Sequence, residues 1–379
     1  MTTCNMKKLE VNFSHKQLSM KSTMELTQKK GLVGLQNMGL TCYANATLQC
    51  LRNLPRVSWL FTSGRFDSLF DKSPKSKRKL QQDVCQSFAD LIQQQNQGQH
   101  PGIMRPAGFW NVTHDCLTDS VYEHMKVKAP HDSHEFLMFM IECLHEGTSM
   151  EVEMQIMKQP PQTESEKRIV QALETWKSNF SKEYSPLVDM FYGLLHFTTT
   201  CTECKNPFHR WEPFNTLKAA VPKRTAELDA NPPSLLSLIA DDMKAEVIEG
   251  YSCDKCAPNR HNADRKVAIW RLPQNLVICL KRFTPDGQKI HTKVAVDQIL
   301  DMQSLFSEES PEKTAITKYE LRGVIDHHGG SRGGHYTAQV KEPVSSNWVI
   351  FDDESVLPIA QPHFGESTYI LFYERASSK

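Results

Sequence analysis

The sequence lacks three features that would assign it to a common class of protein. None of its apolar runs approaches the ~20 residues that a membrane helix needs. Its first stretch, MTTCNMKKLEVNFSHKQ, lacks the apolar segment of a secretory signal. It has no net charge, because 44 basic residues balance 44 acidic ones, whereas proteins that coat nucleic acid usually show a basic excess. We therefore expect neither a membrane nor a nucleic acid as partner, and we expect a reducing compartment, cytoplasmic and/or nuclear.

The composition is that of a folded protein with a sizeable core. Of the 379 residues, 39 % are hydrophobic and 9 % aromatic, which excludes a disordered or collagen-like chain. The length favours two or three units, or one elaborated domain. Residues 1–30 are polar and weakly patterned, so we expect an extension outside the core. The basic run at 71–79 is interpreted as a solvated loop, with a nuclear-import or anion-binding patch as the alternative.

The hydrophobic pattern changes near residue 190. Before it we expect helices at 41–53, 81–97 and 133–145, and a charged, helix-prone segment at 151–185. After it come β-branched and aromatic runs, bounded by Gly, Pro, Asn or Asp, that are typical of strands. The predicted strands are 193–201, 266–272, 275–283, 319–328, 335–341, 347–353 and 368–375. The sequence thus predicts a mostly helical N-terminal half and a mostly β C-terminal half.

Two of the cysteine spacings point to a metal. The chain has eleven cysteines, and lone ones in a reducing setting are usually buried as small hydrophobes. Cys201 with Cys204, and Cys253 with Cys256, form C-x-x-C pairs among strand-like segments. Four thiolates of this kind hold a structural zinc ion (Zn²⁺) tetrahedrally, with no open position for water. The 48 residues between the pairs exceed a compact zinc-ribbon spacing, so vestigial or redox-active pairs are the alternative.

Cys42 is the candidate nucleophile. It stands where a Gly-containing loop meets a predicted helix, with Thr41 as the expected N-cap and Pro55 ending the helix. The partial positive charge of a helix N-terminus stabilises a thiolate. Asn37, in the loop, could donate its amide to a developing oxyanion. Read alone, Cys42 is better explained as a structural cysteine at a helix start, because most cysteines are packing residues.

A cysteine nucleophile needs a base, and the base needs an orienting partner. His335 follows Gly333 and Gly334 and opens a predicted strand. Asp352 and Asp353 end the next one. If these strands pair in antiparallel fashion, His335 and Asp352 lie near each other. Each residue alone could be an ordinary strand-edge histidine or an acidic turn.

Five motifs in order resemble the ubiquitin-specific proteases. GLQNMGLTCYANATLQCL at 34–51 is similar to their cysteine box, and GGHYTAQVK at 333–341 with NWVIFDDESV at 347–356 to their histidine box. HDSHEFL at 131–137, RLPQNLVICLKRF at 271–283 and TYILFYER at 368–375 resemble three further family motifs. The resemblance covers about residues 31–375.

The resemblance implies an α+β, papain-like cysteine peptidase fold. It places a helical thumb at about 31–185, zinc-bearing β fingers at about 190–270 and a β palm at about 271–375, with a tail at 376–379. Its partners would be ubiquitin and ubiquitinated proteins, with a larger host complex unspecified. The activity would be hydrolysis of isopeptide or peptide bonds at the C-terminal glycine of ubiquitin.

The resemblance also implies roles for residues. Cys42 matches the nucleophile, His335 the base, Asp352 the orienting acid, Asn37 the oxyanion donor and Asp353 a support of the oxyanion site. In the channel for the ubiquitin tail, the matching residues are Asp132, Gly333, Gly334 and Tyr336. Asp132 could instead merely cap the helix that begins near Ser133.

Three positions depart from the family pattern. Leu40 stands where Asn is more common, Ala46 where Ser is common, and His131 where Gln is usual. None of them removes a catalytic group, but His131 affects the expected tail contacts and Leu40 lies beside the nucleophile. The alternatives are a protease for a ubiquitin-like modifier, a weakly active or inactive ubiquitin-binding module, and a cysteine peptidase of broad specificity.

Overall fold

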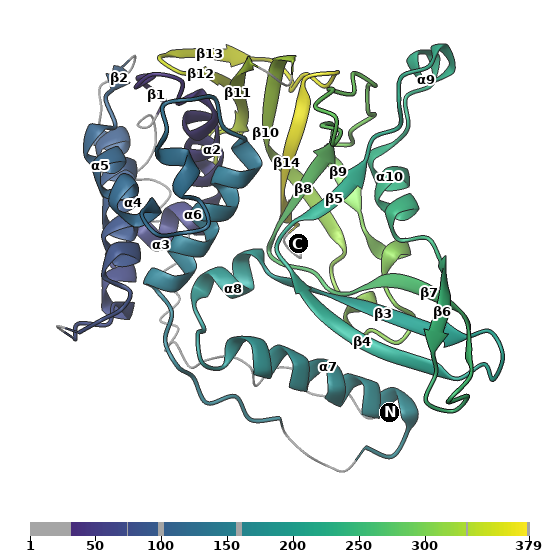
Figure 1. Cartoon of the computed structure of the whole chain (residues 1–379). Helices are drawn as coiled ribbons and strands as arrows, with labels where there is room; N and C mark the ends of the chain where they lie inside the picture. Colours follow the sequence, from purple (N-terminus) through teal and green to yellow (C-terminus); the bar gives the residue numbers. More distant parts are fainter. Residues whose placement is uncertain (1–31, 74, 98–101, 157–160, 331–332, 377–379) are drawn as a thin grey trace.

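A computed structural model describes residues 32–73, 75–97, 102–156, 161–330 and 333–376. The expected extension at 1–30 and most of the tail at 376–379 lie outside these residues. The described chain forms a helical part, which includes a two-stranded sheet, and two larger β-sheets of four and eight strands, called below the smaller and the larger sheet (Figure 1). None of the helices in the described ranges is long and apolar enough to cross a membrane.

The helical part contains Cys42, the candidate nucleophile. Strand β1 (Val33–Leu35) pairs in parallel with β2 (Gly102–Met104) beside it. The helices are α2 (Cys42–Asn53), α3 (Pro55–Thr62), α4 (Lys79–Gln97), α5 (Ala107–Leu117), α6 (Ser133–Gly147), α7 (Glu164–Phe180) and α8 (Pro186–Phe191). Short 3-10 turns lie at Phe66–Leu69 and Glu123–Lys126. Helices α2 to α6 gather on one side of the molecule, whereas α7 lies along the smaller sheet (Figure 1).

The smaller sheet has four antiparallel strands in the order β4-β3-β7-β6. They are β3 (Gly193–Cys201), β4 (Pro207–Phe214), β6 (Glu246–Ser252) and β7 (Arg260–Arg271). The two C-x-x-C pairs lie at the ends of β3 and β6, so the sheet brings them together at one tip. This sheet corresponds to the expected fingers.

The larger sheet follows the order β13-β12-β11-β10-β14-β8-β5, with β9 pairing with β10. Its strands are β5 (Leu217–Ala220), β8 (Asn275–Lys281), β9 (Ile299–Asp301), β10 (Lys318–Gly330), β11 (Gly333–Lys341), β12 (Trp348–Asp352), β13 (Ser355–Ile359) and β14 (Thr368–Arg375). Helices α9 (Ala226–Ala230) and α10 (Leu235–Asp242), with 3-10 turns at Gln303–Leu305 and Pro311–Thr314, lie between its strands in sequence. This sheet corresponds to the expected palm.

Helix α2 packs between the other helices of the helical part and the larger sheet. All twelve of its residues are buried. One apolar core joins Leu48 and Leu51 of α2 to Phe136 of α6 and to Ile325 and Phe372 of the sheet. Burying such side chains stabilises the fold by roughly 1.5–3 kcal/mol each. The core therefore fixes the start of α2, where Cys42 lies, against strands β10 and β11.

The helix and strand predictions are largely confirmed, with two corrections. The segment at 151–185 is helical only over α7, and its residues 157–160 lie outside the described chain. Thr41 occupies the N-cap position of α2, but its side chain makes no capping hydrogen bond. Its Oγ1 instead accepts the backbone N–H of Met38 at 2.9 Å, so it holds the preceding loop. At 71–79 the described residues form turns and a short start of α4, as expected for a solvated loop.

Candidate active site

The loop before Cys42 is wound around the side chain of Asn37. The Asn37 Oδ1 accepts the backbone N–H groups of Gly39 at 2.9 Å and Thr41 at 3.1 Å. To make this turn, Gly39 and Leu40 both take positive φ, at 102° and 61°. Such backbone is ordinary for glycine and tolerated by Asn, but it costs other residues roughly 1–2 kcal/mol. This conformation strains Leu40, and it suits the Asn that the family resemblance implies at this position.

His335 and Asp352 meet as the strand pairing predicts. Strands β11 and β12 are antiparallel, with Ala338 opposite Phe351. The His335 Nε2 lies 2.5 Å from Asp352 Oδ1, a charge-assisted contact. This contact leaves Nδ1 as the ring nitrogen that can exchange a proton with a thiol. The two residues are therefore placed as a candidate base and its orienting acid require.

Asp353 ties the end of the larger sheet to the nucleophile segment. Its Oδ2 accepts Asn37 Nδ2 at 2.8 Å, and its Oδ1 accepts Asn45 Nδ2 at 2.7 Å. Its backbone carbonyl accepts Leu35 N–H at 2.9 Å. A Cβ at Gly34 would lie 2.3 Å from the carbonyl oxygen of Glu354, so only glycine allows this approach. The carboxylate therefore fixes the Asn37 amide beside the start of α2.

The electrostatics of Cys42 differ from the expectation of a thiolate stabilised by the helix start alone. Burial raises the pKa of the Cys42 thiol, and the carboxylate of Asp353 raises it further. The backbone N–H groups of Tyr336, Tyr43 and Cys42 itself oppose this but do not outweigh burial. The described residues show no hydrogen bond between Cys42 and His335. The contact with the Tyr336 amide nevertheless brings the thiol to the residue next to the base.

Asp132 is engaged on both oxygens. Its Oδ1 caps α6 by accepting the N–H groups of His134 at 2.7 Å and Glu135 at 3.1 Å. Its Oδ2 accepts the hydroxyl of Tyr369 at 2.7 Å. The helix cap is thus observed. Each carboxylate oxygen retains further lone pairs, so a contact to a substrate N–H is compatible with this geometry.

The other expected channel residues differ in what surrounds them. Nothing lies within 4 Å of a Cβ built on Gly333, which leaves that face open to a ligand. A Cβ on Gly334 would lie 2.3 Å from His327 Nε2, so Gly334 is required by internal packing. The Tyr336 side chain is buried, with its ring 4.6 Å from that of His327 and 6.3 Å from that of Tyr369. Burial raises the pKa of the Tyr336 phenol well above its ordinary value.

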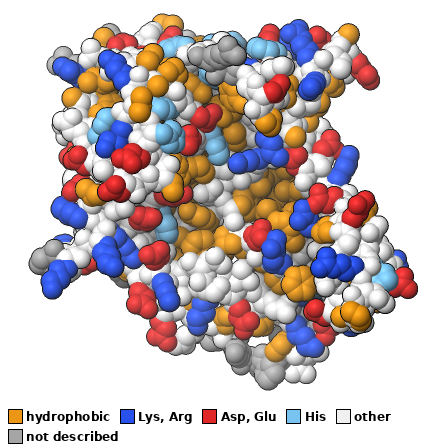
Figure 2. Space-filling model, viewed as in Figure 1, with side chains coloured by type: hydrophobic (Ala, Val, Ile, Leu, Met, Phe, Trp, Pro, Cys, Tyr) orange, Lys and Arg blue, Asp and Glu red, His pale blue; other side chains and the backbone are white. Residues whose placement is uncertain are grey.

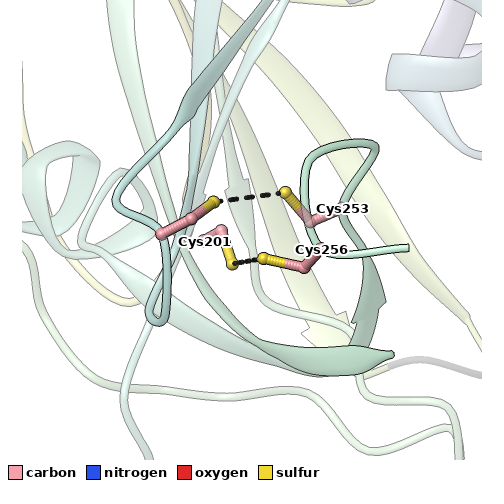
Figure 3. A group of neighbouring side chains, drawn as sticks. Cys201, Cys253 and Cys256 are labelled. Atoms are coloured by element: carbon pink, nitrogen blue, oxygen red, sulfur yellow. Dashed lines mark hydrogen bonds between the residues drawn. The ribbon is translucent and has the colours of Figure 1, made fainter. Parts of the chain in front are cut away.

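The four paired cysteines form one cluster at the tip of the smaller sheet. The Sγ atoms of Cys201 and Cys256 are 3.9 Å apart, and those of Cys204 and Cys253 are 3.5 Å apart. All four sulfurs lie within 4.8 Å of one another (Figure 3). Zinc at about 2.3 Å from four sulfurs requires edges of about 3.8 Å between them. The donors thus fit a tetrahedral metal ion, and they could hold one.

Sequence reasoning missed three residues of the site. Asn45, one turn after Cys42, bonds Asp353; Tyr369 bonds Asp132; Gly34 admits the 353–354 turn. Asn45 is a polar residue on the buried helix α2, which is a signal that could have been read. Tyr369 and Gly34 carry no such signal, because their partners are far away in the chain.

Comparison with known proteins gives one consistent family. The model of the family described as "Ubiquitin carboxyl-terminal hydrolase" matches residues 33–373. The chain is 27 % identical over 368 residues to ubiquitin carboxyl-terminal hydrolase 4 of Saccharomyces cerevisiae, covering 90 % of this chain and 39 % of that protein. It is 29 % identical over 365 residues to ubiquitin carboxyl-terminal hydrolase 2 of Bos taurus, covering 94 % and 57 %. The chain thus spans about two fifths to three fifths of these relatives' length.

Solved structures share the fold. The yeast SAGA DUBm with a mutant Sgf73 superposes with a TM-score of 0.66 at 24 % identity, covering 93 % of this chain and 70 % of that one. The SAGA Ubp8/Sgf11/Sus1/Sgf73 DUB module bound to ubiquitin aldehyde gives 0.67 at 21 %, covering 93 % and 71 %. The α+β, papain-like fold with thumb, palm and fingers is confirmed. Since the family model covers most of the chain, the chain belongs to the ubiquitin carboxyl-terminal hydrolase family, in the ubiquitin-specific protease class.

Proposed function

We propose that the chain is a deubiquitinase that hydrolyses isopeptide or peptide bonds at the C-terminal glycine of ubiquitin. The carrying observation is the contact between His335 and Asp352 on strands packed against the start of α2, where Cys42 lies. Asn37, held by Asp353, supplies an amide at the same place. Nucleophile, base, orienting acid and oxyanion donor are the complete set that thiol acyl transfer needs.

The reaction follows from these roles. His335 Nδ1 takes the proton of the Cys42 thiol, and Asp352 on Nε2 stabilises the resulting imidazolium. The thiolate attacks the carbonyl carbon of the last ubiquitin glycine, while an Asn37 N–H and backbone amides receive the oxyanion. His335 then gives its proton to the departing lysine amine. Water, deprotonated by His335, releases ubiquitin from the thioester and restores the thiol.

The substrate surface supports a large folded partner. Figure 2 shows hydrophobic side chains gathered in the hollowed middle of one face, between the helical part and the sheets. Gly333 is open on its side-chain face, so an extended Gly-Gly tail can approach its backbone closely. Asp132 offers carboxylate lone pairs to the tail's N–H groups. One of the structural neighbours is bound to ubiquitin aldehyde, which supports the same class of substrate for this chain.

We also propose that the cysteine cluster holds one structural zinc ion. Cys201, Cys204, Cys253 and Cys256 would be its ligands, and their spacing supports four-coordinate binding. The ion would join the loops after β3 and β6 and so stabilise the fingers. Metal analysis of the purified chain should give one zinc per molecule. A Cys253→Ser variant should lose the metal and melt at lower temperature, whereas a metal-free, fully stable wild type would exclude this role.

The proposal extends to the complex and the compartment in which the enzyme works. The structural neighbours are modules of several subunits, which supports a host complex for this chain as well. We propose a cytoplasmic and/or nuclear setting, as the sequence leads us to expect. A panel of ubiquitin and ubiquitin-like modifiers with C-terminal fluorophores tests the substrate. Release from ubiquitin alone supports the proposal; release only from another modifier supports the modifier-protease alternative. Binding of ubiquitin without release of the fluorophore would support the alternative of an inactive ubiquitin-binding module.

A further inference from the structure

Three of the cysteines in the helical part form a cluster outside the site and the metal cluster. Cys85 on α4, Cys116 on α5 and Cys143 on α6 come together where these three helices pack. The Sγ atoms of Cys116 and Cys143 are only 3.5 Å apart. The Cys85 thiol is directed elsewhere, since it donates to the backbone carbonyls of Cys143 at 3.7 Å and Leu144 at 3.8 Å. The cluster therefore contains one thiol pair and one separate thiol.

The pair needs little movement to form a bond. A disulfide places the sulfurs about 2.05 Å apart, so the gap must close by about 1.5 Å. Cys116 is the last but one residue of α5, where a helix end can adjust, while Cys143 lies within α6. Cys116 and Cys143 retain 6 % and 5 % exposure, whereas Cys85 has none. A small oxidant can thus reach the pair more readily than it reaches Cys85.

The two sulfurs are not equivalent. Either thiol can be the donor in this contact, and the contact lowers the pKa of Cys116 and raises that of Cys143. The thiolate is the form that reacts with peroxides, and a second thiol beside it resolves the product. Cys116 also lies next to the end of α5, whereas Cys143 lies inside α6, so we assign Cys116 as the sulfur that reacts first and Cys143 as the one that resolves it.

We propose that Cys116 and Cys143 are a site of reversible oxidative modification, which peroxide converts to a disulfide. The Cys116 thiolate attacks one peroxide oxygen and the O–O bond breaks, giving a sulfenic acid and hydroxide, which takes up a proton to form water. The sulfur of Cys143 then attacks the sulfenic sulfur. The S–S bond forms, the S–O bond breaks, and the departing hydroxide leaves as water with the Cys143 proton. Two electrons pass from the sulfurs to the peroxide, and a dithiol reverses the reaction.

The disulfide would join α5 to α6 across a segment of 27 positions. That segment contains Asp132 and Ser133 at the start of α6. Ser133 Oγ lies 2.8 Å from Thr47 Oγ1 of the catalytic helix, and Asp132 caps α6. The bond thus constrains the stretch of chain that carries Asp132, and the oxidised protein should melt at a higher temperature than the reduced one.

The test is a thiol map of the intact wild-type chain. Purified protein is treated with a few equivalents of hydrogen peroxide, quenched with catalase, alkylated under denaturing conditions and digested without reductant. We expect one dominant linked peptide pair, Cys116 with Cys143, that disappears after dithiothreitol. Activity is not the readout, because peroxide also reaches Cys42. Absence of this linkage while Cys42 is oxidised, or linkage of Cys85 to either partner, would overturn the proposal.

Single serine variants test the order of reaction. In Cys143→Ser, the sulfenic acid on Cys116 has no resolving thiol and should be trapped by dimedone. In Cys116→Ser, Cys143 should give at least tenfold less dimedone adduct than Cys116 gives in Cys143→Ser. The matched control Cys85→Ser keeps the pair and should form the linked peptide as the wild type does. Equal adducts on Cys116 and Cys143, or loss of the linkage in Cys85→Ser, would contradict the assigned pair. The thiol map of the wild type tests the proposal even if a variant fails to fold.

Discussion

The amide nitrogen of Asn37 donates to the carboxylate of Asp353 at 2.8 Å, although the two residues are 316 positions apart. The same carboxylate accepts the amide of Asn45 from the first turns of α2. Asn37 carries two N–H groups, so one holds the side chain in place while the other remains for an oxyanion. The contact therefore links the nucleophile loop to the strand end that presents Asp352.

The Asn37–Asp353 contact should behave as one catalytic unit. Asn37→Ala should lower kcat on a ubiquitin substrate by about 10²–10³-fold, the usual effect of removing one oxyanion donor. Asp353→Ala should lower kcat through the same donor, so the double variant should be no slower than the worse single one. Asn45→Ala leaves the Asn37 contact intact and serves as the control with the smaller loss. Multiplicative losses in the double variant would show that Asp353 acts independently of Asn37.

Replacing Leu40 should stabilise the protein. Its φ of 61° costs a leucine roughly 1–2 kcal/mol, and its side chain is 47 % exposed, so little packing is lost. Leu40→Asn or Leu40→Gly should raise the free energy of unfolding by about 1 kcal/mol in chemical denaturation. Leu40→Ala, which keeps a Cβ at the same φ, should not. If Leu40→Asn is destabilising, the leucine side chain makes contacts that outweigh the strain.

Alanine variants of the two glycines before His335 should have different effects, one on substrate binding and the other on the stability of the fold. Gly333→Ala adds a methyl group to an open face, so stability should change by less than about 0.5 kcal/mol while KM for ubiquitin substrates rises about tenfold. Gly334→Ala puts a Cβ into His327 and should destabilise the fold by about 1–3 kcal/mol. Thermal melts and steady-state kinetics measure both. An unchanged KM in Gly333→Ala would show that Gly333 does not line the channel for the ubiquitin tail.

The reactivity of Cys42 should depend on His335 through pH. Burial raises the pKa of the thiol, so without a base the thiolate forms only above the ordinary range for cysteine. In wild type, proton transfer to His335 should extend alkylation of Cys42 down to neutral pH. In His335→Ala, the alkylation rate at neutral pH should fall at least about tenfold and its rise should shift to higher pH. Peptide mass mapping follows Cys42 alone. If the alkylation rate of Cys42 depends on pH in the same way in the wild type and in His335→Ala, His335 is not the base.

The predictable parts of the site depend on local pattern. The helix start at Cys42 follows from apolar spacing, and the meeting of His335 with Asp352 follows from the pairing of consecutive strands. The contacts of Asp353 with Asn37, and of Tyr369 with Asp132, depend on folding across 316 and 237 positions. No periodicity in the sequence encodes such distances.

Three of the missed strands share one physical reason. Strands β4, β6 and β13 are edge strands, with neighbours on one side only within their sheets. Exposed edges tolerate charged residues and proline, as in PFHRWEPF, EVIEGYS and SVLPI, which hides the alternation of a half-buried strand. The strain at Leu40 was equally hidden, because a leucine gives no sign of a positive φ.

Covalent capture by ubiquitin tests the central claim most directly. Ubiquitin carrying a C-terminal electrophile, incubated with the wild-type chain, should give a single adduct whose modified residue is Cys42. Cys42→Ala should give no adduct while still binding ubiquitin, because only the attacking sulfur is lost. An adduct on another cysteine, or undiminished capture by Cys42→Ala, would contradict the account.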